Sequence, residues 1–120
     1  MNETYLRICS TLRNKAIRNY PLSSLNTWRI GGPVDILCEP SDTNELLEIL
    51  DLLSENCAPW WLIGNGSNVL FPDSGLRGVV VKLCGEFKEI KVTDDSIIAG
   101  AASTCSRLTR VATECGLSGL

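Results

Sequence analysis

Apolar residues recur along this chain with two different periods, and the change of period divides it into helices and strands. Residues 3–18 carry an apolar residue at every third or fourth position, which predicts a helix. The short apolar run Val34–Cys38 predicts a strand. Asp42 followed by Glu45 resembles a capping box, so we expect a second helix to begin there and to run to about Asn56.

The second half of the chain reads as strands followed by one more helix. Trp60–Ile63 predicts a buried strand, in which Trp60 and Trp61 point to opposite faces and core packing is favoured for both. Three more strands are expected at residues 79–83, 89–92 and 96–99, and residues 94–95 form the turn between the last two. A helix is expected at residues 104–115, and Gly116 ends it. A strand, a helix and a strand followed by a mainly antiparallel run and a helix predict an α+β domain.

The stretch Gly64-Asn65-Gly66-Ser67-Asn68 comes directly after the Trp60–Ile63 strand and has the composition of a phosphate cradle. Two glycines permit positive φ and close approach of a ligand, and the short polar side chains can donate hydrogen bonds to phosphate oxygens. Consecutive amides in such a loop would face an anion. An ordinary turn-forming loop would have the same composition, so the composition alone leaves both interpretations open.

Two common nucleotide-binding loops do not fit this stretch. A Rossmann fingerprint would need a third glycine where Val69 stands, and it would need a helix to follow. A Walker loop would need Gly-Lys followed by Ser or Thr, and the chain contains no such triplet. The stretch by itself therefore leaves both a phosphate cradle and an ordinary turn-forming loop open.

Composition narrows the possible partners and compartment. A chain of 120 residues is about one domain, and its net charge of −3 argues against nucleic-acid binding. No apolar run approaches the ~20 residues that cross a membrane, and no secretory signal is recognised at the start, so we expect a soluble cytoplasmic protein. The cysteines are Cys9, Cys38, Cys57, Cys84, Cys105 and Cys115. No two have zinc-site spacing and the chain has no histidine, which predicts reduced, mostly buried thiols and no metal.

Five segments together carry a family resemblance. They are Asn26-Thr27-Trp28-Arg29-Ile30-Gly31-Gly32-Pro33, Gly64-Asn65-Gly66-Ser67-Asn68-Val69-Leu70, Arg77-Gly78-Val79-Val80-Val81, Ala99-Gly100-Ala101 and Gly116-Leu117-Ser118-Gly119-Leu120. In this order and spacing, over about residues 20 to 120, the chain resembles the UDP-N-acetylenolpyruvoylglucosamine reductase family, the UDP-N-acetylmuramate dehydrogenases of peptidoglycan synthesis.

The resemblance implies a fold and an activity. The fold would be an incomplete FAD-binding domain of the vanillyl-alcohol-oxidase/PCMH type, with a helical segment at residues 1–20, a partial FAD-binding domain at 21–120 and no substrate-binding domain. The activity would be reduction of UDP-N-acetylglucosamine enolpyruvate, a small UDP-sugar, to UDP-N-acetylmuramate. NADPH would deliver hydride to FAD, and the protein would position and tune that cofactor.

Residue by residue, the resemblance assigns cofactor contacts but no catalytic group. Gly64, Asn65, Gly66, Ser67 and Asn68 match the FAD pyrophosphate loop, and Gly100 and Ala101 match a segment near the flavin. Asn26, Thr27, Gly31 and Gly32 match a first glycine motif whose role is mainly structural.

The serine proton donor and the glutamate of the family have no match in the 120 residues, because Ser67, Ser103, Ser118 and Glu114 stand in other motifs. We therefore expect an incomplete chain that is inactive alone. Another FAD-dependent oxidoreductase of the same superfamily, or a non-catalytic FAD-binding module, stays open.

Overall fold

The computed structural model describes residues 3–64 and 69–119. The helices and strands are α1 (Glu3–Leu12), β1 (Ala16–Pro21), β2 (Pro33–Cys38), α2 (Thr43–Glu55), β3 (Trp60–Ile63), β4 (Leu76–Lys82), β5 (Ile90–Val92), β6 (Ile97–Ala99) and α3 (Cys105–Glu114). Short 3₁₀ helices are η1 (Arg13–Lys15), η2 (Leu22–Leu25) and η3 (Gly85–Lys88). The mixture of helices and strands agrees with the predicted α+β class.

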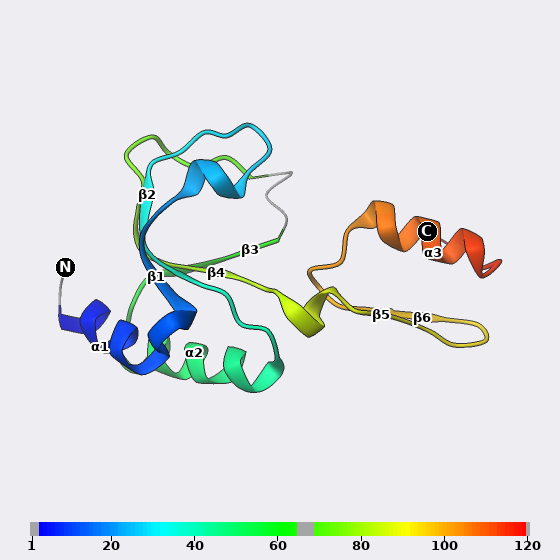
Figure 1. The fold of residues 1–120 in the computed structure, drawn as a ribbon, viewed down its shortest axis with the longest axis horizontal. Coiled ribbons are helices and arrows are strands. Elements are labelled where there is room, and N and C mark those ends of the chain that lie inside the picture. The colour runs from blue at the N-terminus through cyan, green and yellow to red at the C-terminus, as the bar shows by residue number, and fades with distance from the viewer. Residues whose placement is uncertain (1–2, 65–68, 120) are drawn as a thin grey trace.

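Four strands form one sheet in the order β1-β2-β4-β3 (Figure 1). Strand β1 is antiparallel to β2, whereas β4 is parallel to both β2 and β3. The chain crosses from β2 through α2 to β3, a connection that returns it in the same direction. The mainly antiparallel run expected from residue 79 onward is therefore wrong for β4, and only β5 and β6 pair in that way.

Both faces of the sheet are covered, as the uninterrupted apolar run of β4 predicts. Val79, Val80 and Val81 are all fully buried. On one face, residues of β2 and β4 pack with α1 and α2 in a cluster that contains Ile8, Leu12, Ile36, Ile49, Leu53, Val79 and Val81. On the other face, a second cluster joins η2 to the sheet and contains Leu22, Leu25, Val34, Leu37, Ile63, Phe71 and Val80. The two clusters are separated by the sheet itself.

The first helix is shorter than the sequence predicts. Helix α1 ends at Leu12, and residues 16–21 form β1, whose pairing with β2 runs from Ala16 opposite Cys38 to Pro21 opposite Pro33. Residues 16–18 could continue the helical stripe, but as part of a strand their backbone gains hydrogen bonds to β2. The boundary expected at residue 20 falls inside this strand, so the first 20 residues are not purely helical.

Strand β3 lies at the opposite edge of the sheet from β1, and this position leaves its tryptophans partly exposed to solvent. Only Ile63 of the strand is buried, whereas Trp60 and Trp61 are 43% and 38% exposed. An edge strand has one neighbour instead of two, and its side chains lose half of their lateral cover. The expectation that Trp60–Ile63 is a buried strand with core tryptophans is therefore wrong.

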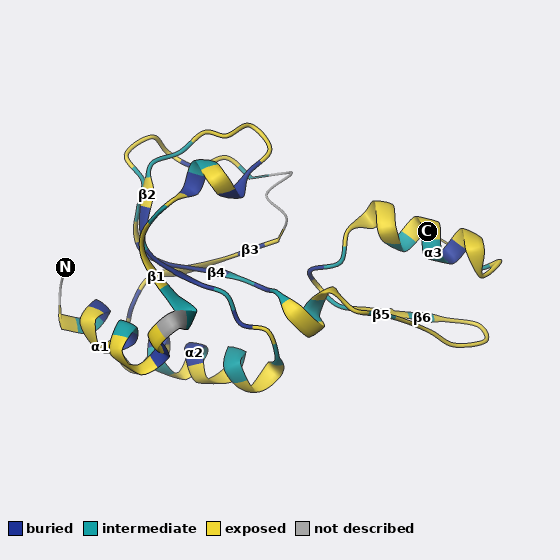
Figure 2. Ribbon diagram, in the orientation of Figure 1, coloured by how far each residue is buried: buried dark blue, intermediate teal, exposed yellow. Residues whose placement is uncertain are grey.

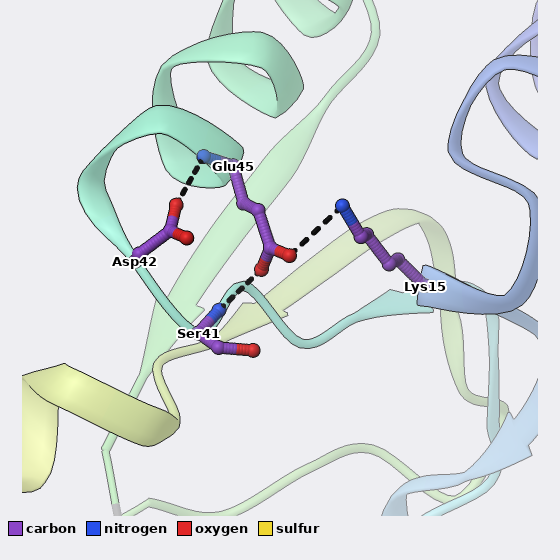
Figure 3. A network of polar contacts seen from close by, with 4 residues as sticks. All are labelled: Lys15, Ser41, Asp42 and Glu45. Carbon is purple, nitrogen blue, oxygen red and sulfur yellow. Dashed lines mark hydrogen bonds and ion pairs between the residues drawn. The ribbon is translucent and has the colours of Figure 1, made fainter.

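Helix α2 begins where the capping pattern predicts. The side chain of Asp42 accepts a hydrogen bond from the amide of Glu45 at 2.8 Å. The Glu45 carboxylate turns to the amide of Ser41 at 2.7 Å and to the ammonium of Lys15 at 2.8 Å, as Figure 3 shows. The Lys15 hydrogen bond, followed by that of Ser41, lowers the pKa of Glu45 from its ordinary value. This network ties the turn after α1 to the start of α2.

Residues 85–119 form a smaller part beside the sheet, which we call the hairpin region, and residues 3–83 are the sheet region (Figure 1). Strands β5 and β6 make the predicted antiparallel hairpin, closed by a hydrogen bond from the Thr93 amide to the Ser96 carbonyl at 2.8 Å. Helix α3 begins at its cap Thr104 and ends before Gly116, whose φ is 70°, as predicted. Within residues 3–64 and 69–119, no helix has the length and apolar character needed to span a membrane.

The six cysteines are all free thiols, but they are less buried than the sequence predicts. Cys38 is buried and two others are partly buried, whereas Cys57, Cys105 and Cys115 are exposed. The expectation that most thiols lie in the core is therefore wrong. The exposed ones lie at or beyond the ends of helices and in the hairpin region, where little structure covers them.

Candidate FAD-binding site

A small cavity of about 140 Å³ adjoins the C-terminal end of β3, at the point where the glycine stretch begins. It is lined by Leu62, Ile63, Gly64, Leu83, Ala101 and Ala102. Gly64 and Ala101 were both predicted for one site, although 37 positions separate them, and the fold brings them to one cavity. A Cβ added at Gly64 would meet no atom within 4 Å, so the space beside it is open.

The remainder of the predicted cradle, Asn65, Gly66, Ser67 and Asn68, lies outside the described residues. Both of its flanks are anchored in the same core. Ile63, before the stretch, is 7% exposed, and Phe71, after it, is 5% exposed, and both belong to the cluster under η2. The described chain therefore fixes where the stretch leaves the sheet and where it rejoins the core.

The amide of Ala101 is available to a ligand, unlike its neighbours. The amide of Gly100 donates to the Glu89 carbonyl and that of Ala102 donates to the Phe87 carbonyl, each at 2.8 Å. Ala101 lies in a turn that is closed by the Ser103 amide, which donates to the Gly100 carbonyl at 3.0 Å. The amide of Ala101 has no acceptor among the residues that the structure describes. A donor of this kind beside the Gly64 cavity suits a phosphate or carbonyl oxygen.

Gly100 serves a different purpose from Ala101 in this structure. A Cβ at Gly100 would lie 2.1 Å from the carbonyl oxygen of Phe87, so the glycine is required by close packing against η3. Gly100 also lines a separate cavity of about 320 Å³ with residues that include Glu86 and Lys91. The two residues predicted together are therefore divided, with Ala101 toward Gly64 and Gly100 toward η3.

The first glycine motif lies in the loop between η2 and β2, where Asn26 is buried. The side-chain amide of Asn26 donates to the carbonyls of Leu22, at 3.0 Å, and Ile30, at 2.7 Å. The side-chain oxygen of Asn26 accepts a hydrogen bond from the Ile30 amide at 3.3 Å. All three bonds close the loop on itself. Asn26 also borders a polar surface hollow of about 510 Å³ with Ser23, Ser24, Thr27 and Arg29.

Four cavity residues have no counterpart in the sequence prediction. They are Leu62, Ile63, Leu83 and Ala102, and each is an ordinary apolar residue with no motif of its own. They meet only because β3, the end of β4 and the segment after β6 converge at one place. No local pattern could have marked them.

Comparison with known proteins identifies the family. Residues 34–119 match the family model described as FAD binding domain, which is more than half of the chain. The chain belongs to the FAD-binding domain family. The cavity at Gly64 and the free amide of Ala101 both lie within the matched residues.

Curated relatives of this FAD-binding domain have one name in common. UDP-N-acetylenolpyruvoylglucosamine reductase of Heliobacterium modesticaldum is 37% identical over 114 residues, which cover 95% of this chain and 36% of the relative. The reductase of Clostridium beijerinckii is 41% identical over 92 residues, covering 77% of this chain and 30% of that protein. The chain thus spans about a third of the length of these relatives.

A solved structure agrees with the sequence comparison. The crystal structure of UDP-N-acetylenolpyruvylglucosamine reductase (MurB) from Thermus caldophilus superposes with a TM-score of 0.68 at 30% identity. The superposition covers 88% of this chain and 35% of that one. The predicted α+β FAD-binding fold is therefore confirmed, and so is the resemblance to these reductases.

The described residues around the Gly64 cavity offer backbone amides and small or aliphatic side chains, a chemistry that fits an FAD diphosphate. No basic side chain lines the Gly64 cavity, so an anion there would meet backbone amides, of which that of Ala101 is free within the described part of the chain. The side chains around it are small or aliphatic, which leaves room for a ligand to approach the backbone. Backbone donors are the usual partners of phosphates in glycine-rich loops.

Proposed function

We propose that this FAD-binding domain serves a UDP-N-acetylenolpyruvoylglucosamine reductase, in which Gly64, Asn65, Gly66, Ser67 and Asn68 hold the FAD diphosphate. The observation that carries the proposal is the cavity shared by Gly64 and Ala101, in a chain 37% identical to such a reductase. Two segments that contribute no charged side chain to that cavity nevertheless converge there, and both match the family model.

Each part of the site has a distinct task in this proposal. The Gly64 end opens onto space that a phosphate can approach, since no Cβ projects from it. Ala101 donates its free amide to the cofactor, and Gly100 supports it by holding residues 99–102 against η3. Leu83 and Ala102, which are buried, give the cavity an apolar wall.

The reaction in this proposal is the reduction of UDP-N-acetylglucosamine enolpyruvate to UDP-N-acetylmuramate, with NADPH as hydride donor. FAD, when bound, supplies the hydride-transfer chemistry, and the domain supplies binding and orientation. None of the 120 residues matches the family's proton-donating serine or its glutamate, so the proposal gives this domain a cofactor-holding task and no proton transfer.

The proposal is tested by titrating FAD into the purified chain and following flavin fluorescence and absorbance. We expect saturable binding by the wild type and a loss of about a hundredfold or more in affinity for Gly66→Asp, because a carboxylate in the cradle would repel the diphosphate. Gly119→Asp is the matched control, since Gly119 has open space around it in the hairpin region and lies outside the Gly64 cavity.

Two outcomes would contradict the proposal. Equal affinities for Gly66→Asp and the wild type would remove the glycine stretch from the site. Absence of binding by a wild-type chain that is folded by circular dichroism would show that these residues alone do not hold FAD.

The same preparation tests the limit that we place on activity. Mixed with NADPH and the enolpyruvyl UDP-sugar, the chain should show no substrate-dependent loss of NADPH absorbance, because it carries no match to the proton-donating groups. A substrate-dependent rate above that of a heat-denatured sample would refute this expectation.

A further inference from the structure

Two loops come into close contact at the place where the chain returns from the glycine stretch, and at Gly32 the contact is between backbone atoms. The amide of Gly32 donates to the carbonyl of Pro72 at 2.9 Å. A Cβ added at Gly32 would lie 2.3 Å from the Asp73 carbonyl oxygen and 2.6 Å from the Gly75 nitrogen. No side chain larger than hydrogen fits between these two segments.

The neighbouring glycines repeat the same close contact from both sides. Gly31 has a φ of 135°, and a Cβ there would lie 2.7 Å from the Cβ of Phe71. Gly75 has a φ of 80°, and a Cβ there would lie 2.0 Å from the Pro33 carbonyl oxygen. Gly31 and Gly32 in one loop and Gly75 in the other thus allow the two loops to pack in close contact.

The loop that carries Gly31 and Gly32 is itself held firmly. The Asn26 side chain makes its three hydrogen bonds to Leu22 and Ile30, and the Leu22 amide donates to the Gly32 carbonyl at 3.0 Å. Leu22 in turn is fully buried beside Phe71 in one core cluster. The contact to residues 71–75 is therefore made by a braced loop.

We propose that Asn26, Gly31 and Gly32 are positioning residues for the FAD diphosphate loop, acting through residues 71–75. The inference rests on the proposed function, since it concerns the same loop. Ile63 fixes one flank of the glycine stretch in the core, and the close contact of the two loops fixes the other flank at Phe71 and Pro72. A flank that is already fixed in the free chain lowers the ordering cost of ligand binding.

A merely structural role makes a different prediction from a positioning role. Loss of a structural contact lowers the melting temperature but leaves the affinity of the folded molecules unchanged. Loss of positioning weakens FAD binding by molecules that are still folded, and it loosens residues 69–76 more than the rest of the sheet region.

The test compares Gly32→Ala with Gly119→Ala in the whole chain. Gly119 has a φ of 112°, where a side chain adds backbone strain that Gly32 does not have, and no described atom lies within 4 Å of an added Cβ. Gly119→Ala therefore adds the same methyl group without the clash between the two loops. For Gly32→Ala we expect amide exchange over residues 69–76 to rise about tenfold or more, with α2 unchanged. Well below its melting temperature, its FAD affinity should fall roughly tenfold to a hundredfold. Gly119→Ala should change neither quantity.

If Gly32→Ala does not fold, Asn26→Ala decides, because it removes the three loop-closing bonds and adds no atom. Unchanged exchange over residues 69–76 in the folded variant, or FAD affinity within twofold of the wild type, would overturn the positioning role. If the wild type itself binds no FAD, the proposed function fails for this chain, and the exchange measurement alone then supports or overturns the fixing of residues 71–75.

Discussion

The sheet region and the hairpin region of this domain are built from equally regular patterns, yet they differ in what they bury. Of the twenty buried hydrophobic residues in the described part of the chain, eighteen lie between residues 3 and 83, in two clusters on opposite faces of the sheet. In residues 85–119 only Ala102 and Ala112 are buried, and Figure 2 shows the contrast between the dark central strands β2 and β4 and the largely exposed hairpin and α3. An amphipathic pattern thus predicts that an element forms, but not how fully its apolar face is covered.

The contrast has a consequence for function. Ala102 belongs to the larger cluster of the sheet region, and its neighbour Ala101 borders the Gly64 cavity. The segment that joins the hairpin to α3 is therefore held by the sheet core, although the hairpin and helix on either side of it are not. One wall of the candidate site is therefore formed by Ala101 and Ala102, at the point where the hairpin region packs on the sheet core.

The largest effect should come from truncating a residue at the centre of the sheet region. Leu37→Ala removes a fully buried side chain of β2 and should lower the free energy of unfolding by about 2–5 kcal/mol. Leu108→Ala in α3, at a half-buried position, should lower it by about 1 kcal/mol or less. Urea unfolding followed by circular dichroism measures both, and equal losses would remove the energetic distinction between the regions.

An effect of intermediate size is expected on the pH dependence of stability, because a thiol of the sheet region is buried whereas those of the hairpin region are exposed. Burial raises the pKa of Cys38 to about 12 from an ordinary 9.0. Below pH 9.0 the thiol is protonated in both the folded and the unfolded chain, so its contribution is fully present there. As the pH rises from 9.0 toward 12, the unfolded thiol ionises and the folded one does not, and stability should fall.

Melting temperatures of the wild type and Cys38→Ala over this alkaline range test the expectation. The fall should be shallower in Cys38→Ala and unchanged in the control Cys105→Ala, whose thiol is exposed in α3. In parallel, an alkylating reagent at neutral pH should modify Cys105 and Cys115 before Cys38. Rapid modification of Cys38 in the folded chain would show that the sheet core opens more readily than its burial implies.

The smallest effect should come from the exposed ion pair at the start of α2. The folded pKa of Glu45 lies below its ordinary 4.5, so the stabilisation is present above that value and is lost as the pH falls through the folded pKa. Lys15→Met should therefore flatten the acid-side fall of the melting temperature and change it little at neutral pH. Lys91→Met in the hairpin is the control, and identical acid profiles for the two variants would exclude a role for the pair.

Sequence reasoning succeeded where structure depends on neighbouring residues. The start of α2 at Asp42, the turn at residues 93–96 and the end of α3 before Gly116 were each predicted from caps and turns, which act within a few positions. It failed at β1 and at the exposure of Trp60 and Trp61, because both depend on which strand lies alongside. Local periodicity of apolar residues does not predict the order of strands in a sheet or which strands lie at its edges.

The candidate site divides in the same way. The sequence by itself marked the glycine stretch, because its residue types permit backbone to approach a phosphate, and the family resemblance added Gly100 and Ala101 as candidates. Only the tertiary structure decided that the amide of Ala101 has no acceptor among the described residues and that Gly100 is needed for packing. It alone also brought Gly32 against Pro72, since contacts between segments 40 residues apart arise from the route of the chain through the sheet.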